Sequence, residues 1–164
     1  MTAAVPPQAV EARPAARGDI DRLVEMYSEA ADELKPMRGG RVLLGLNHRD
    51  APVELCFARQ LEDPRQFVVV AFAGPDNIVG YGTCRTLELP ENERVGSIRD
   101  LYVSPAARRR GAGRAMAGLL VRWCSSQGCI GVDADALPGS RAVKSFFEEE
   151  GFTARLLVMH RPLK

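Results

Sequence analysis

The chain has 164 residues, which suits one domain with an ordinary hydrophobic core. Its 22 Lys and Arg residues nearly balance 21 Asp and Glu residues, which argues against nucleic acid or an anionic membrane surface as a partner. The longest apolar run, residues 67–73, is far shorter than the roughly 20 residues of a membrane helix, and the N-terminus lacks the pattern of a secretion signal. We therefore expect a soluble cytoplasmic protein in which any anion site is local.

The first half of the chain predicts one strand, two helices and a second strand. We expect residues 1–9 to form a flexible tail ahead of a single domain, residues 10–164. Asp19 is a candidate helix cap, because apolar side chains follow it at three- and four-residue spacing until Pro36. The predicted elements are a strand over 10–15, a helix over 20–34, an ambiguous segment over 41–50, a short helix over 52–61 and a strand over 66–73.

The second half predicts a hairpin followed by alternating strands and helices. A GPDN turn joins the strand over 66–73 to the next strand, which indicates an antiparallel pair. Residues 113–127 give the clearest helical periodicity in the chain. The predicted elements are strands over 78–87 and 94–103, a helix over 113–127, a strand over 129–137, a helix over 141–150 and a last strand over 152–160.

The cysteines and histidines give no metal-binding pattern. None of the four cysteines forms a CxxC pair, and only two histidines are present to assist them. We expect reduced, structural thiols and no metal site. These residues are Cys56, Cys84, Cys124, Cys129, His48 and His160.

The segment SPAARRRGAG, residues 104–113, combines three arginines with two glycines directly before a helix. Unpaired amides and the helix dipole at a helix N-terminus favour an anion, and glycines at 111 and 113 let phosphate oxygens approach the backbone. Both nucleotide-binding fingerprints fail, since Met116 replaces the third Rossmann glycine and Arg114 replaces the Walker lysine. The alternative is a solvated basic turn without a ligand.

The longer stretch DLYVSPAARRRGAGRAM resembles the acetyl-coenzyme A motif of the GNAT N-acetyltransferase superfamily. In that family a strand reading Leu-x-Val-x-Pro precedes Arg or Gln, two free positions, Gly, one free position, and Gly or Ala. The matching residues here are Leu101, Val103, Pro105, Arg108, Gly111 and Gly113. Further segments, from ARPA and GDIDRLVEMY to SRAVKSFFEEEGF and VMHRPL, extend the resemblance over almost the whole chain.

The resemblance implies an α+β fold of three layers, with a mixed, mostly antiparallel sheet flanked by helices. It also implies a bulge that splays the strand over 94–103 from the strand over 129–137, with the pantetheine arm of acetyl-coenzyme A in the gap. No metal is implied. The residues implied for coenzyme A are Leu101, Tyr102, Val103, Arg108, Arg109, Arg110, Gly111, Ala112, Gly113, Arg114, Ser140, Lys144 and Phe147.

Acetyl transfer to an amine is helped by a general base, and Asp100 is the leading candidate. Strand alternation places Asp100 and Tyr102 opposite Leu101 and Val103, toward an acceptor cleft. Asp100 could equally form a structural ion pair with a neighbouring arginine, either Arg99 or Arg85.

The family's usual proton donor has no counterpart here, because this chain departs from the family at two positions. Phe147 replaces the tyrosine that donates a proton in many members, and Ser140 replaces an asparagine. Tyr102, Ser104 or water could protonate the leaving thiolate instead. We carry Asp100 and Tyr102 as the catalytic candidates.

The leading hypothesis is an N-acetyltransferase that acts on a small-molecule or peptide amine by direct attack in a ternary complex. The alternative, prompted by Phe147, is an acyl-coenzyme A binding module with little activity. A third hypothesis, RNA or anion binding through the arginine cluster, conflicts with the near-neutral charge. Arg38, Arg41 and Arg49 hint at an acceptor carrying a carboxylate or phosphate, and a homodimer stays open.

Overall fold

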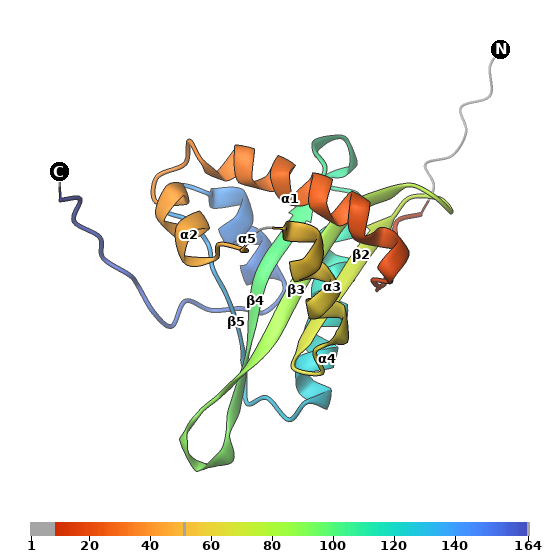
Figure 1. Ribbon diagram of the computed structural model, residues 1–164. Helices are drawn as coiled ribbons and strands as arrows, with labels where there is room; N and C mark the ends of the chain where they lie inside the picture. Colours follow the sequence, from red (N-terminus) through yellow and green to blue (C-terminus); the bar gives the residue numbers. More distant parts are fainter. Residues whose placement is uncertain (1–8, 51, 164) are drawn as a thin grey trace.

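The computed structural model describes residues 9–50 and 52–163, and it shows a five-stranded sheet with helices on both faces (Figure 1). The strands lie in chain order; the first four are antiparallel, and β5 runs parallel to β4. They are β1 (Glu11–Pro14), β2 (Gln66–Phe72), β3 (Ile78–Glu88), β4 (Arg94–Val103) and β5 (Val132–Ala134). The expected mixed, mostly antiparallel α+β architecture is confirmed.

The described residues also form five α-helices and three short 3-10 turns. α1 and α3 pack on one face of the sheet and α4 packs on the other. The ambiguous segment forms α2, which follows directly after the left-handed Gly39 (φ 79°). The helices are α1 (Ile20–Leu34), α2 (Gly40–Leu46), α3 (Val53–Glu62), α4 (Ala112–Ser126) and α5 (Arg141–Glu149), and the turns span Arg17–Asp19, Pro90–Asn92 and Pro105–Ala107.

Strand alternation divides the core into two layers. Along β2, Val69 belongs to the cluster that contains Met116 of α4, whereas Val68 belongs to the cluster that contains Leu23 of α1 and Phe57 of α3. All five side chains are almost completely buried, and each contributes roughly 1.5–3 kcal/mol of transfer free energy. These two clusters fix α1 and α3 against one face of the sheet and α4 against the other.

β4 contains a bulge at Arg99. Thr83 of β3 is opposite Asp100 and Cys84 is opposite Ile98, so Arg99 has no partner in the ladder. The pairing of β4 with β5 ends at Ile98, and the two strands are unpaired beyond it. The expected bulge and splay are therefore both present.

The predicted last strand over 152–160 is wrong. Residues 152–163 form no strand, and Figure 1 shows this segment leaving the sheet. Leu156 to Met159 are 70–83% exposed, although their composition favours a strand. A strand needs a neighbouring strand for its backbone hydrogen bonds, and β5, the last strand of the sheet, is itself only three residues long. The strand expected over 129–137 is likewise restricted to β5.

Asp19 lies at the start of α1 but does not cap it. Its carboxylate accepts hydrogen bonds from the Ala16 amide (2.7 Å) and from both Nη atoms of Arg13 (2.7 and 2.9 Å). The hydrogen bond from Arg13 is the main cause that holds the pKa of the Asp19 carboxyl below its usual range, and the hydrogen bond from the Ala16 amide acts in the same direction. Asp19 therefore ties β1 to the turn before α1.

We expect Asp19→Asn to lower the free energy of unfolding by about 1–2 kcal/mol at neutral pH, because the charged hydrogen bonds to Arg13 are lost. The loss is no larger because the Arg13 side chain is 41% exposed and solvent weakens the ion pair. A lowered carboxyl pKa stabilises the fold above the unfolded-state value near ~3.9, and that stability is lost as pH falls through the native value. Urea unfolding at neutral and acidic pH should show the gap between variant and wild type closing below about pH 4. The exposed Asp21→Asn is the control, and equal losses in both variants would contradict this role.

Candidate active site

The turn before α4 presents backbone amides in one place. Arg109 and Gly111 both adopt left-handed φ angles, 61° and 88°. Ala115 is the first residue of α4 whose amide closes a helical turn, onto the Gly111 carbonyl at 2.9 Å, and no side chain caps the helix within the described chain. The amides of the first turn are therefore positioned for an anion, which the helix dipole also favours.

The two glycines of this turn have different surroundings. A Cβ atom on Gly111 would meet no heavy atom within 4 Å, so the backbone here is open to a ligand. A Cβ atom on Gly113 would lie 3.2 Å from the Phe146 ring of α5. Gly113 thus allows close packing of α4 on α5.

The arginines of the turn have separate roles. Arg108 folds back, because its Nε donates to the Val103 carbonyl (2.8 Å) and its Nη2 lies 2.7 and 2.8 Å from the Glu33 carboxylate oxygens. Arg114 pairs with Glu150 at 2.7 Å. Arg109 and Arg110 are exposed. Arg108 therefore anchors the turn to β4 and α1.

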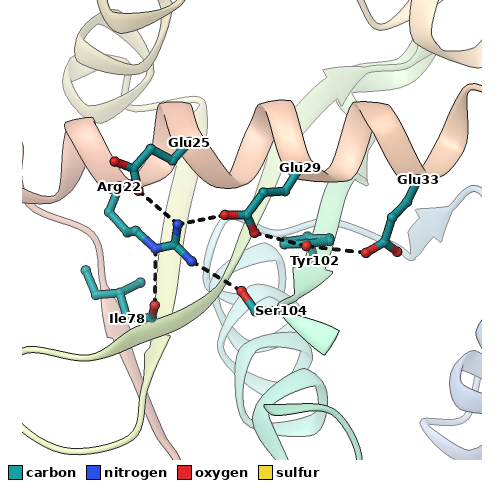
Figure 2. Close-up of polar contacts among 7 residues, drawn as sticks. All are labelled: Arg22, Glu25, Glu29, Glu33, Ile78, Tyr102 and Ser104. Atoms are coloured by element: carbon teal, nitrogen blue, oxygen red, sulfur yellow. Dashed lines mark hydrogen bonds and ion pairs between the residues drawn. The ribbon is translucent and has the colours of Figure 1, made fainter. Parts of the chain in front are cut away.

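Figure 2 shows the polar contacts between α1 and the end of β4. The guanidinium of Arg22 lies 2.8 Å from Glu29, 3.3 Å from the Ser104 hydroxyl oxygen and 3.4 Å from the Ile78 carbonyl oxygen. These contacts join α1 to the start of β3 and to the residue directly after β4. The position of the turn before α4 is thereby fixed relative to α1.

Tyr102, the second catalytic candidate, belongs to the same network. Its hydroxyl donates to Glu29 (3.1 Å) and lies 3.4 Å from Glu33, toward α1 (Figure 2). Burial first, and then the bond to Glu29, raises the pKa of Tyr102 to about 12. These contacts favour a structural role, in which Tyr102 holds β4 against α1. A catalytic role for Tyr102 stays a prediction.

Asp100, the candidate base, is paired with Arg49. One carboxylate oxygen lies 2.6 Å from the Arg49 guanidinium and accepts a 2.6 Å hydrogen bond from the Thr83 hydroxyl, whereas the other has only contacts of 3.4 Å or longer. The geometry favours the ion-pair alternative, with Arg49 in place of the partners we had considered. Its use as a base stays a prediction.

Arg49 is unusually well enclosed for an arginine. Its side chain is only 8% exposed, and its guanidinium lies 4.7 Å from the Tyr27 ring centroid and 4.6 Å from that of Phe57. Cation–π contacts with two aromatic rings and pairing with Asp100 offset the burial of the charge.

A cavity of about 320 Å³ lies beside this ion pair, and its charged lining consists of Arg49, Arg85, Arg99 and Asp100. The exposed His48 also lines it. Of the three arginines that the sequence suggested for an acceptor pocket, only Arg49 lines the cavity, and Arg85 and Arg99 were missed. The expected bulge could have indicated Arg99, because a bulge brings two consecutive residues to one side of a strand.

The α5 candidates lie apart from the cavity lining. Ser140 occupies the N-cap position of α5, and Lys144 pairs with Glu148 at 2.8 Å. Phe147 is 8% exposed and packs against Phe146 and Phe152, with ring centroids 5.3 and 5.1 Å apart. Its ring belongs to the core on the α4 side of the sheet.

None of the four cysteines forms a disulfide. In the core, the sulfur atoms of Cys84 and Cys124 lie 3.9 Å apart. Within the described residues, no group of three or more His, Cys, Asp and Glu side chains is arranged to hold a metal ion. Among the helices of residues 9–50 and 52–163, none has the length and apolar character needed to cross a bilayer.

Comparisons with known proteins agree with this architecture. No curated protein sequence matches the chain. An aminoglycoside acetyltransferase from an uncultured soil metagenomic sample, solved with sisomicin, superposes with a TM-score of 0.71 at 20% identity over 95% of this chain and 96% of that chain. A Trypanosoma brucei acetyltransferase gives 0.66 at 25% identity over 94% and 99%.

A third neighbour is AAC(6')-Iy in complex with a bisubstrate analogue, CoA-S-monomethyl-acetylneamine. It gives a TM-score of 0.69 at 16% identity over 94% of this chain and 99% of that chain. The decisive comparison is by sequence, because residues 23–152 match the acetyltransferase (GNAT) family. The chain therefore belongs to the GNAT acetyltransferase family.

Proposed function

We propose that this chain is an N-acetyltransferase that moves the acetyl group of acetyl-coenzyme A to a small-molecule primary amine. The observation that carries the proposal is the splay of β4 from β5, which begins at Arg99 and Asp100, beside the cavity, and leads along β4 to the turn before α4. A thioester carrier in the splay would therefore have its diphosphate near the helix N-terminus and its acetyl group near the cavity.

The cofactor contacts that we propose follow this path. Backbone groups of Leu101, Tyr102 and Val103, beyond the last pair between β4 and β5, would bind the pantetheine amides. The amides from Arg109 to Arg114 would hold the diphosphate, aided by the exposed arginine side chains. Ser140 and Lys144 would contact coenzyme A from α5, and Arg108 supports the turn through Glu33.

The reaction is a direct acyl transfer. The amine nitrogen bonds to the acetyl carbon, the carbon–sulfur bond breaks, the amine loses a proton and the thiolate gains one. We propose that the freer oxygen of Asp100 attracts the amine and accepts its proton. The hydroxyl of Tyr102 donates to Glu29 of α1, which leaves it poorly placed to protonate the thiolate. A thiol with a pKa near ~8.5 can leave as the thiolate and take its proton from solvent after the carbon–sulfur bond has broken.

We expect Tyr102→Phe to keep kcat within about threefold, because the hydroxyl is bonded to α1, and to lower the free energy of unfolding by about 1 kcal/mol. Steady-state kinetics and urea unfolding measure the two effects. A loss of kcat in the range of about 10² to 10⁴ would instead identify Tyr102 as a catalytic proton donor.

Thermal unfolding with and without acetyl-coenzyme A tests the cofactor, and thiol release with a panel of amines tests the reaction. Ligand at 100 times its dissociation constant should stabilise the fold by about 2.7 kcal/mol. Binding of acetyl-coenzyme A without turnover of any amine would favour the alternative, an acyl-coenzyme A binding module. That alternative is motivated by Phe147, which is buried and has no acidic proton to donate. Absence of both effects would overturn the proposal.

A further inference from the structure

The cavity beside β4 carries more positive than negative charge. Three arginines and one aspartate line it, which leaves an excess of two positive charges. Asp100 is already engaged by Arg49. Over residues 9–50 and 52–163, the side chains of Arg85 and Arg99 make neither an ion pair nor a hydrogen bond. Two guanidinium groups therefore face this space without a carboxylate of their own.

Two buried donors in the same place also lack an acceptor. The Nε atoms of Arg49 and Arg99 are buried, and neither has a hydrogen-bond partner among the described residues. Buried donors in folded proteins are almost always paired with a protein group, an ordered water or a ligand, so these two Nε atoms are open to an acceptor from outside the chain, either water or a ligand atom. Burial, and then the neighbouring Arg85, lowers the pKa of the Arg99 guanidinium, although Asp100 and Asp135 act in the opposite direction.

The position of these groups links them to the reaction. Because of the β4 bulge, Arg99 and Asp100 both line the cavity, and they are the first two residues beyond the last pair with β5. Gln60 and Gln66 add neutral polar groups to the lining. A volume of about 320 Å³ suits a small molecule.

We propose that the cavity is an oxyanion subsite for the acceptor, in which Arg85 and Arg99 bind a carboxylate or phosphate group while the amine of the same molecule lies near Asp100. This inference rests on the proposed acetyltransferase function and specifies its substrate class. Guanidinium groups pair with either oxyanion through two parallel hydrogen bonds, so carboxylate and phosphate share the same chemistry here. A polycationic amine such as an aminoglycoside would be repelled by the two uncompensated arginines.

The test compares amines that differ only in the anionic group. β-Alanine is paired with propylamine as the carboxylate probe, and O-phosphoethanolamine is paired with ethanolamine as the phosphate probe. Each is measured by thiol release with acetyl-coenzyme A and, independently of turnover, by thermal unfolding at constant ionic strength. We expect the anionic member of at least one pair to raise the unfolding temperature and to exceed its partner in kcat/KM by about 10- to 100-fold.

The matched variants are Arg85→Gln/Arg99→Gln and the control Arg41→Gln/Arg59→Gln, which removes the same charge from exposed positions outside the cavity lining. The first should lose the preference and the anion-dependent shift, and the second should keep both. The subsite does not exist if no anionic probe raises the unfolding temperature at tens of millimolar, or if the amine without the anionic group has the higher kcat/KM in both pairs. The same follows if the two double variants respond alike to the anionic probes. A failed reaction with retained anion-dependent shifts would count against the acetyltransferase proposal alone.

Discussion

Replacing Gly111 by glutamate is expected to abolish the stabilisation of this chain by acetyl-coenzyme A. A Cβ atom at this position would meet no heavy atom within 4 Å apart from the neighbouring residues in the chain, so a glutamate side chain would project into the open space beside the first turn of α4. The glutamate carboxylate would compete with the diphosphate for the helix amides and repel its charge. The shift of about 2.7 kcal/mol at 100-fold excess over the dissociation constant should disappear, and thiol release should fall with it.

The chain provides a matched control at the other end of the same helix. Gly128 follows α4, has a left-handed φ of 74° and is equally free of neighbours, so Gly128→Glu introduces the same residue with a similar backbone strain. We expect this variant to lose some stability, about 1 kcal/mol, and to keep its full response to acetyl-coenzyme A. A full response in the Gly111 variant, or equal loss in both, would show that the diphosphate binds elsewhere.

The features that the sequence predicted correctly depend on short-range patterns. The periodicity behind Gly113 gave α4, and the run around the GPDN turn gave the β2–β3 hairpin, because helix and hairpin geometry repeat over a few residues. The motif between β4 and α4 is likewise continuous in the chain. Its resemblance to the family was sufficient to predict the bulge and splay that the register of β3, β4 and β5 confirms.

The features that were missed depend on residues far apart in the chain. Arg49 and Asp100 are 51 positions apart, and nothing local distinguishes Arg49 from Arg38 or Arg41. Which arginine reaches β4 is decided by how α2 packs on α1 and how α3 packs on β2. The predicted last strand failed for a related reason, since strand propensity is local whereas a strand forms only beside another strand.

The ion pair of Arg49 and Asp100 leads to the largest expected change in stability. Arg49→Met keeps an unbranched apolar stem between Tyr27 and Phe57 but leaves the Asp100 carboxylate, whose side chain is 17% exposed, without its counter-charge. Breaking a buried pair in this way costs about 3–5 kcal/mol, a large part of the 5–15 kcal/mol that stabilises a typical domain. Urea unfolding should show this loss, whereas the exposed Arg41→Met should change the free energy of unfolding by no more than about 0.5 kcal/mol.

The double variant Arg49→Met/Asp100→Asn separates the lost pair from the lost packing. Because it removes both charges, it should be more stable than Arg49→Met alone, and the two single losses should not add. If the single losses do add, Arg49 stabilises the fold through its aromatic contacts and the carboxylate is indifferent to it. If Arg49→Met does not fold, recovery of a folded chain in the double variant makes the same distinction. Coupling between these residues would show that Asp100 is held in place by its partner from the segment after α2, which is the condition for its freer oxygen to meet an amine in the cavity.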